Sequence, residues 1–339
     1  MDSIIFEATQ ACNHDCLHCY NVWKSGRPYP QGQLDTPETL KLIDRIIKQT
    51  RCKVFSFTGG EPLLRPDLLP LVERAARHNV RVNLLTNGSL LTDQVIRDLI
   101  NAGVSLFEIP LLSAERETHD ALTRSESFDR VTEAIAGVKL AGGQVVTVFV
   151  VTLRNHDHLH DMLRMSFALS ADAVMVNRFN PGGTGLGHLG ELLPTPEQVA
   201  EALAVADRDS GAFGLPIAVS VPVPPCLVDH ARYKRLSFGY CAAATERAYY
   251  TLDALGNVRM CNHSPLILGN IRETHFNRLI RSEAARQFAC AVPPECGGCA
   301  LANVCQGNCK AAAEQAYGSA RALEPFVAAN ETHRTLVRP

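Results

Sequence analysis

The sequence lacks the features of a membrane-spanning, secreted or nucleic-acid-binding chain. None of its apolar stretches approaches the roughly 20 residues needed to cross a bilayer. It has no long basic run, and its formal net charge is −2, which argues against nucleic acid or an anionic membrane as a partner. The first residues, MDSIIFEATQACNHDC, show neither the positive n-region nor the apolar h-region of a secretion signal. We therefore expect a cytoplasmic protein with no nucleic-acid partner and no membrane partner.

Cysteine, by contrast, is abundant. The 339 residues include twelve cysteines, and in a cytoplasmic chain metal or cluster ligation is favoured over disulfides. The cysteines are also bunched, because three lie between residues 12 and 19 and five lie between residues 290 and 309. Structural cysteines would be scattered, and the isolated Cys52 is the one that we interpret as structural.

The first two thirds of the chain alternate between short apolar runs and amphipathic patterns. The apolar runs predict strands at residues 4–8, 54–57, 82–85, 106–109, 145–151 and 173–176. The amphipathic patterns predict a helix with Thr36 as its cap and Pro37 at its first position, and further helices at residues 67–77, 92–101, 128–140 and 156–168. This alternation predicts an α/β fold class with a parallel sheet, in which six units form a partial (β/α)6 barrel. Functional sites of such folds lie beyond the carboxyl ends of the strands.

The pattern changes after residue 176. Residues 177–190 are rich in glycine and form either a connector or a loop over the mouth of the barrel. The proline-rich stretch VPVPPC at residues 221–226 marks a boundary. We expect a barrel domain over residues 1–215, a small cysteine-rich domain over residues 216–325 and a tail over residues 326–339.

The first cysteine group follows the first expected strand. Cys12, Cys16 and Cys19 have the spacing CxxxCxxC, and a loop of this kind can fold three thiolates around a cubane. Three ligands for four irons leave one iron open to bind a cofactor or substrate. The alternative is a zinc site, for which His14 or His18 would supply a fourth ligand.

This group and the sequence that follows it resemble the radical S-adenosylmethionine superfamily. In that family the CxxxCxxC motif, here followed by Tyr20, comes after the first strand of a partial barrel. A GGEP-like motif ends the second strand, and here that strand ends in Thr58-Gly59-Gly60-Glu61-Pro62. The resemblance continues at Leu85-Thr86-Asn87-Gly88, which ends the third strand. One departure is Pro110, which stands where the peptide-modifying branch has a serine near the cofactor ribose; either Ser113 replaces that contact or another residue does.

The resemblance implies the cofactors and the residues that hold them. Cys12, Cys16 and Cys19 would hold a [4Fe-4S] cluster that cleaves S-adenosylmethionine. The cofactor-binding residues would be Gly59, Gly60, Glu61, Pro62, Asn87 and Tyr20. Two glycines let a backbone approach a ligand closely.

The later cysteines resemble the SPASM extension of the same superfamily, which carries two auxiliary iron–sulfur clusters. The resemblance assigns Cys241, Cys261 and Cys309 to the first auxiliary cluster and Cys296, Cys299 and Cys305 to the second. Cys226 is the best candidate for the fourth ligand of the first cluster. The second cluster is completed by Cys290 or another residue, or keeps an open iron. The alternative for this region is a zinc ribbon.

The resemblance also implies the chemistry. Reductive cleavage of S-adenosylmethionine gives a 5′-deoxyadenosyl radical that abstracts a substrate hydrogen, and the auxiliary clusters fit the removal of a further electron. A one-electron donor such as flavodoxin or ferredoxin is expected. The first hypothesis is a maturase that oxidises or cross-links a residue of a ribosomal peptide or protein. The second is oxidation or epimerisation of a sugar, an aminocyclitol or a tetrapyrrole side chain, and the third is a non-catalytic electron carrier.

Four further polar residues are candidates for donors or acids in such a reaction. They could equally be solvated or supporting groups, and they are Asn177, Arg178, His188 and His263.

Overall fold

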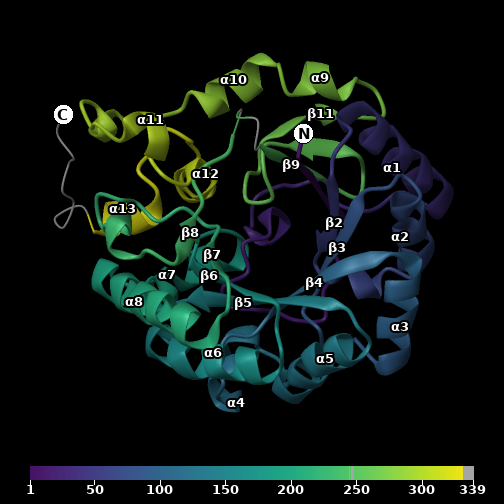
Figure 1. The fold of residues 1–339 in the computed structure, drawn as a ribbon. Coiled ribbons are helices and arrows are strands. Elements are labelled where there is room, and N and C mark those ends of the chain that lie inside the picture. The colour runs from purple at the N-terminus through teal and green to yellow at the C-terminus, as the bar shows by residue number, and fades with distance from the viewer. Residues whose placement is uncertain (244, 246–247, 331–339) are drawn as a thin grey trace.

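The computed structural model describes residues 1–243, 245 and 248–330. Its strands form one curved sheet, and Figure 1 shows the sheet lining a ring with helices on the outside. The first eight strands lie in chain order and each is parallel to the next. They are β1 Ser3–Thr9, β2 Val54–Gly59, β3 Arg81–Leu85, β4 Val104–Pro110, β5 Gln144–Val151, β6 Ala173–Arg178, β7 Ile217–Val219 and β8 Leu236–Phe238.

The helices of the first two thirds lie between these strands and cover the outer face of the sheet (Figure 1). The predicted α/β alternation, with its parallel sheet and all six strands, is therefore confirmed. The helices are α1 Thr36–Thr50, α2 Leu68–Ala76, α3 Asp93–Ala102, α4 Arg116–Thr123, α5 Phe128–Leu140, α6 Leu159–Ala168, α7 Leu189–Leu192 and α8 Pro196–Phe213.

Local sequence explains where these helices begin. The cap of α1 is Asp35, whose carboxylate accepts a hydrogen bond from the backbone N–H of Glu38, rather than Thr36 as the sequence suggested. The cap of α8 is Thr195, which forms a reciprocal capping box with Gln198. One residue separates the predicted cap of α1 from the observed one because both Asp and Thr are good caps.

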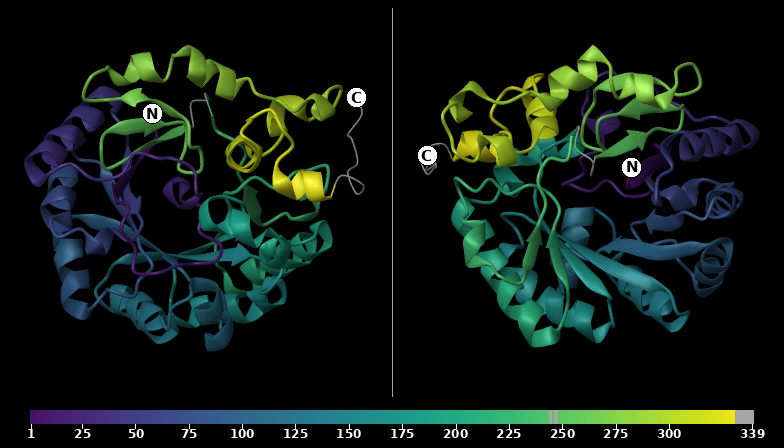
Figure 2. Two further views of the ribbon diagram at one scale, coloured as in Figure 1. Left: turned by 180° about the vertical axis from the view of Figure 1, so that it is seen from behind. Right: turned by 45° about the horizontal axis from the view of Figure 1, so that its top comes forward.

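The C-terminal third adds strands to the other edge of the same sheet. Strand β9 (Tyr249–Leu252) is parallel to β1, and β10 (Asn257–Arg259) and β11 (Ile267–Asn270) follow in antiparallel order. Figures 1 and 2 show these strands and the C-terminal helices filling the arc between β8 and β1. The helices are α9 Phe276–Leu279, α10 Glu283–Ala289, α11 Ala302–Cys305, α12 Lys310–Tyr317 and α13 Pro325–Ala329.

The sheet therefore runs across the expected domain boundary. Strands β7 and β8 lie beyond residue 215, yet they continue the parallel sheet. The expected tail begins inside α13, and residues 331–339 of that tail lie outside the described residues.

The core lies between the sheet and the surrounding helices. Phe6, Phe55 and Phe57 are fully buried and contact one another across β1 and β2, and α1 packs its apolar face over these strands. None of the helices in the described ranges combines the length and apolar character that crossing a bilayer requires.

Two buried ion pairs join the C-terminal third to the barrel. Glu7 of β1 accepts a hydrogen bond from the guanidinium of Arg259 in β10. Arg178 at the end of β6 pairs with Glu324, just before α13, at 2.7 Å, and both side chains are fully buried. Because a buried charge without its partner is costly, these pairs fix how the two parts of the chain meet.

Candidate active site and cysteine groups

The three N-terminal cysteines share one loop at the carboxyl end of β1. The thiols of Cys12 and Cys19 lie close enough to Cys16 to raise the pKa of its thiol beyond the rise that burial causes. Burial raises the pKa of Cys12 and Cys19 as well. Three gathered thiols with raised pKa values stay protonated on their own and become thiolates when they ligate iron. The loop thus fits the family's cluster by its donor set.

The end of β2 lies directly against this loop. The N–H of Gly60 donates to the carbonyl of Thr9 at 2.8 Å, and that of Glu61 donates to the carbonyl of Ala11 at 2.8 Å. A Cβ atom on Gly59 would stand 2.2 Å from the oxygen of Thr9, and one on Gly60 would stand 2.1 Å from the oxygen of Ala11. The two glycines are therefore needed for the contact between β2 and the cysteine loop.

Glu61 is fully buried and joins the second and third strands. Its carboxylate accepts hydrogen bonds from the N–H of Leu63 at 3.0 Å, from the hydroxyl of Thr86 at 2.8 Å and from the N–H of Asn87 at 2.8 Å. Pro62 begins the short 3-10 turn Pro62–Leu64. The carboxylate of Glu61 thus links the turn after β2 to the turn after β3 by hydrogen bonds and holds the two turns together.

Asn87 extends this network to the cysteine loop. Its side-chain amide donates to the side chain of Asn13 at 2.9 Å, and its oxygen accepts from the N–H of Ser89 at 2.9 Å. Asn21, two residues after Cys19, donates to the carbonyl of Gly59 at 3.1 Å. The cysteine loop and the ends of β2 and β3 therefore form one connected face.

Tyr20 lies between the cysteine loop and the C-terminal third. Its ring stacks on His263 with 3.9 Å between ring centroids, and its oxygen accepts a hydrogen bond from Asn262 at 2.9 Å. Burial, reinforced by the charges of Arg178 and Arg259, lowers the pKa of His263 to about 3, so its ring is neutral. This stack connects the residue after Cys19 to the segment that carries Cys261.

The first C-terminal group brings together Cys241, Cys261 and Cys309. Burial and the nearby thiols of Cys309 and Cys241 raise the pKa of Cys261. Burial also raises the pKa of Cys309 to about 11, and the amide of Asn180 donates to its sulfur at 3.3 Å. The three cysteines that the resemblance assigned to one cluster therefore lie together.

The second group holds four cysteines around one small cavity. Cys296, Cys299 and Cys305 line it as expected, and Cys226 lines it with them; the other lining residues are Pro225, Leu301, Ala302 and Gly307. Burial raises the pKa of Cys305 to about 11, and the thiols of Cys226 and Cys296 add to that rise. The structure therefore places Cys226 with the second group, whereas the sequence had favoured the first.

Cys290 does not line that cavity. It is exposed at the end of α10, and together with Cys241 it lies close enough to Lys310 to raise the pKa of the ammonium, which burial lowers overall. Cys290 therefore lies beside Lys310, the residue that follows Cys309. Within the described residues, no set of three or more His, Cys, Asp or Glu side chains converges on a point that could hold a single metal ion.

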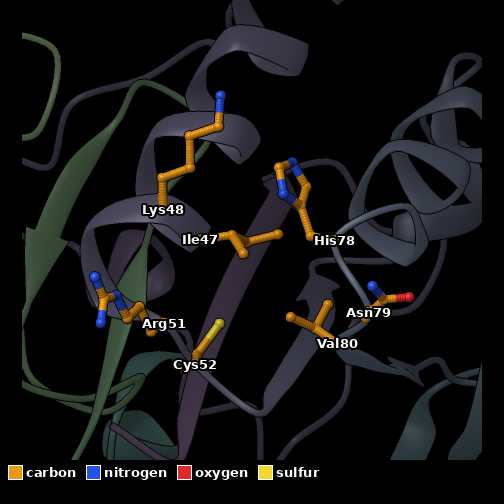
Figure 3. A pocket seen from close by; sticks show the side chains of 7 residues that line it. All are labelled: Ile47, Lys48, Arg51, Cys52, His78, Asn79 and Val80. Carbon is orange, nitrogen blue, oxygen red and sulfur yellow. The ribbon is translucent and has the colours of Figure 1, made fainter.

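Cys52 lies apart from all of these cysteines. It is buried, and it lines a cavity formed by the end of α1 and the segment that leads into β3 (Figure 3). This cavity is at the amino ends of β2 and β3, opposite the end that carries the cysteine loop. The position agrees with a structural role for Cys52.

Sequence reasoning missed Glu108, a carboxylate in the middle of β4. Its neighbours Phe107 and Ile109 are fully buried against the helices, so alternation turns Glu108 to the inner face of the sheet. Burial raises the pKa of Glu108 to about 7, and no charged group contributes to that rise. A glutamate inside an otherwise apolar strand was the signal that could have identified it.

The polar candidates named from the sequence have structural partners instead. Arg178 pairs with Glu324, and the amide oxygen of Asn177 accepts hydrogen bonds from Ser220 and Val221. His188 lies 3.1 Å from Glu191. Ser113, which could have replaced the missing serine, is buried, and its hydroxyl lies 2.9 Å from the ring nitrogen of His158.

Comparisons with known proteins identify the family of this chain. The Radical SAM superfamily matches residues 6–165, and the SPASM iron-sulfur cluster-binding domain matches residues 241–310. An AdoMet-dependent heme synthase of Oleidesulfovibrio alaskensis is 30% identical over 95% of this chain and 86% of its own length. Mycofactocin maturase MftC of Mycobacterium tuberculosis is 29% identical over 91% of this chain and 78% of its own length. The solved structure of native anSMEcpe with bound AdoMet shares the fold, with a TM-score of 0.72 over 98% of this chain and 96% of that chain at 18% identity.

The chain belongs to the radical SAM superfamily. Its C-terminal match places it in the SPASM branch, whose members carry auxiliary iron–sulfur clusters. Its cofactors are therefore a [4Fe-4S] cluster, S-adenosylmethionine and auxiliary iron–sulfur clusters, and the gathered thiols fit these groups by their donor chemistry.

Proposed function

We propose that this chain is a radical enzyme that oxidises or cross-links a residue of a ribosomally made peptide or of a protein. The observation that carries the proposal is the contact of Gly59 and Gly60 with the loop of Cys12, Cys16 and Cys19. S-adenosylmethionine and the cluster would supply the radical that takes hydrogen from the substrate. The protein's own contribution is to bind, orient and shield these groups.

In this proposal the cysteine loop holds the cluster, and the backbone from Gly59 to Pro62 receives the cofactor beside it. The carboxylate of Glu61 keeps that backbone and the Asn87 turn at a fixed separation through its three hydrogen bonds. Because buried hydrogen-bonded groups move little, the cofactor would be met by a preformed surface.

The substrate would enter the inside of the barrel, where Glu108 is the group best suited to contact it. A half-buried carboxyl with a pKa of about 7 can accept a proton near neutral pH. It can also bind a cationic group of a substrate, whose charge would favour the ionised carboxylate. Either role suits a reaction that removes a hydrogen atom, an electron and a proton.

The auxiliary clusters would take up the electron that an oxidised substrate must lose. Tyr20 and His263 form a continuous stack from the residue after Cys19 to the segment of Cys261. This packing would bring the first auxiliary cluster near the radical-forming site. In the cytoplasm, a one-electron donor such as flavodoxin or ferredoxin would reduce the cluster held by Cys12, Cys16 and Cys19.

A peptide or protein substrate is supported by two kinds of relative. Besides the mycofactocin maturase, a PqqA peptide cyclase of Bradyrhizobium diazoefficiens is 25% identical over 99% of this chain and 88% of its own length. A small-molecule substrate, such as a sugar, an aminocyclitol or a tetrapyrrole side chain, is the second candidate. The AdoMet-dependent heme synthase of Methanosarcina barkeri favours it, because the alignment covers 95% of both chains at 28% identity.

Anaerobic reconstitution and turnover test the central proposal. Three [4Fe-4S] clusters would give about twelve irons per chain. Reduced enzyme should form 5′-deoxyadenosine, and replacing Cys12, Cys16 and Cys19 together with alanine should abolish this product while leaving about eight irons. Continued formation of 5′-deoxyadenosine by the triple variant would contradict the proposal.

Deuterium transfer then distinguishes the substrates. Peptides encoded by genes beside this one would be made in deuterated form and offered to the same preparation. Deuterated small molecules made by the enzymes of neighbouring genes would be offered in parallel. Deuterium in 5′-deoxyadenosine identifies the substrate that loses hydrogen. Transfer only from small molecules would replace the peptide proposal with the second candidate.

A further inference from the structure

We infer that Cys226 supplies the fourth thiolate of the second auxiliary cluster, together with Cys296, Cys299 and Cys305. The inference rests on the proposed function only in requiring auxiliary clusters. It concerns a ligand that comes from the connection between β7 and β8, well before the other three in sequence. All four sulfur-bearing side chains line one cavity.

Three of the ligands come from one short, tightly turned segment. The N–H of Cys299 donates to the carbonyl of Cys296 at 3.2 Å, which closes the turn between them. The N–H of Cys305, at the end of α11, donates to the carbonyl of Leu301 at 2.8 Å. Gly307 has a φ of 81°, and a Cβ atom there would stand 2.2 Å from the ring of Pro293. This segment can present three thiolates to one cluster, and its next cysteine, Cys309, does not line the cavity.

Cys226 lines the same cavity from a different segment, the connection between β7 and β8. It follows Pro224 and Pro225, and the carbonyl of Pro224 accepts hydrogen bonds from the N–H groups of Leu227 and Val228, both at 3.0 Å. These bonds form a tight turn that directs Cys226 towards the cavity it shares with Cys305. Thiolates are the ligands that iron–sulfur clusters prefer, and the rest of the lining is apolar apart from backbone.

The assignment changes what is left for the first auxiliary group. Cys241, Cys261 and Cys309 remain there without Cys226, and Cys290, which lies beside Lys310, is assigned to neither cluster. Lys310 lies among them, and its ammonium donates to the carbonyl of Ala289, next to Cys290, and to Gln306 at 2.9 Å. The two clusters would therefore differ in how completely cysteine ligates them.

Pairwise substitution tests the assignment by iron content and by electron paramagnetic resonance, without any substrate. The background is the full chain with Cys12, Cys16 and Cys19 replaced by alanine, which retains only the auxiliary clusters. Cys226→Ser should alter the same resonance that Cys305→Ser alters and leave the other cluster's resonance unchanged. The double variant Cys226→Ser/Cys305→Ser should lose no more iron than Cys305→Ser alone, about four irons.

The matched pair is Cys226→Ser/Cys261→Ser, which should alter both resonances. If Cys226 instead ligates the first auxiliary cluster, Cys226→Ser/Cys305→Ser will alter both resonances and Cys226→Ser/Cys261→Ser only one. That result would overturn the inference. If Cys226→Ser changes neither resonance, the inference is also overturned. Iron near four in the wild-type protein, with none in the background, would contradict the auxiliary clusters themselves and thus the proposed function.

Alkylation of the wild-type holoprotein gives an answer that does not depend on folded variants. Under anaerobic, native conditions iodoacetamide should modify the exposed Cys290 and leave Cys226 unmodified. After iron is removed by a chelator, Cys226 should react along with Cys296, Cys299 and Cys305. Rapid modification of Cys226 in protein that keeps all its iron would overturn the inference.

Discussion

The two cysteine regions of this protein are built in opposite ways. Cys12, Cys16 and Cys19 lie on one loop that follows β1, and the backbone of the next strand holds that loop directly. The C-terminal groups draw on cysteines from residue 226 to residue 309, which the fold brings together from separate segments. The first region is set by local sequence, whereas the second exists only when the whole chain has folded.

The joint between the two regions should show the largest effect on stability. Arg259→Met leaves Glu7 buried without its partner and also removes hydrogen bonds to the carbonyls of Asn262 and Ser264. We expect the free energy of unfolding to fall by about 3–5 kcal/mol. Denaturant titration of anaerobic protein measures this change.

Two variants control that measurement. Arg281→Met removes an exposed arginine and should change the free energy of unfolding by less than about 0.5 kcal/mol. The double variant Glu7→Gln/Arg259→Met should recover part of the loss, because no buried charge remains. Equal stability of Arg259→Met and wild type would mean that the pair does not join the regions.

The local region should be sensitive to a single methyl group. Gly60→Ala places a Cβ 2.1 Å from the carbonyl oxygen of Ala11, so the cysteine loop and β2 must separate. A displacement of this kind should slow 5′-deoxyadenosine formation about 100-fold. Gly190→Ala, where a Cβ would meet no atom within 4 Å, is the matched control and should keep the wild-type rate. A normal rate for Gly60→Ala would show that the close contact is unimportant.

The charged groups of the regions differ. Among the residues that the structure describes, no cation contributes to the pKa of Glu108 inside the barrel, whereas Arg178 and Arg259 are paired with carboxylates. The pKa of Glu108 is about 7 in the folded state, compared with 4.5 for a free glutamate. Between these two pH values the folded state therefore binds more protons than the unfolded state. The free energy of unfolding should therefore fall as pH rises from about 4.5 to about 7.

Glu108→Gln removes that pH dependence. Above about pH 7 the variant should be more stable than wild type by on the order of 2 kcal/mol, and the difference should vanish near pH 4.5. Unfolding midpoints across this range measure it, with the exposed Glu201→Gln as control. A parallel decline in wild type and Glu108→Gln would assign the pH dependence to other groups.

The smallest effect should come from the cysteine that belongs to neither region. Cys52→Ala removes one buried sulfur at the amino end of β2 and should cost about 1 kcal/mol of unfolding free energy. Iron content and 5′-deoxyadenosine formation should match wild type. A loss of iron in Cys52→Ala would show that the region of Figure 3 supports a cluster after all.

The strands and helices of the barrel followed from periodicity because each is long enough to show its buried face. Helix α5 matched its expected range of 128–140, and the six expected strands differ from β1 to β6 by one or two residues at their ends. Strands β7 and β8 were missed, because three residues are too few to show alternation. Glu108 was missed because sequence alone does not say which face of β4 looks inward.

The sequence by itself determined the chemistry of the first site. A thiolate triplet on one loop and the glycines of the next strand need only one strand pairing to meet, and that pairing follows from a parallel sheet built in chain order. Only the tertiary structure decided how the remaining cysteines divide. Cys226 and Cys305 are separated by nearly eighty residues, so their contact depends on how β7, β8 and α11 pack. Spacing along the chain carries no information about that packing, and only the folded chain shows that Cys226 shares a cavity with Cys296, Cys299 and Cys305.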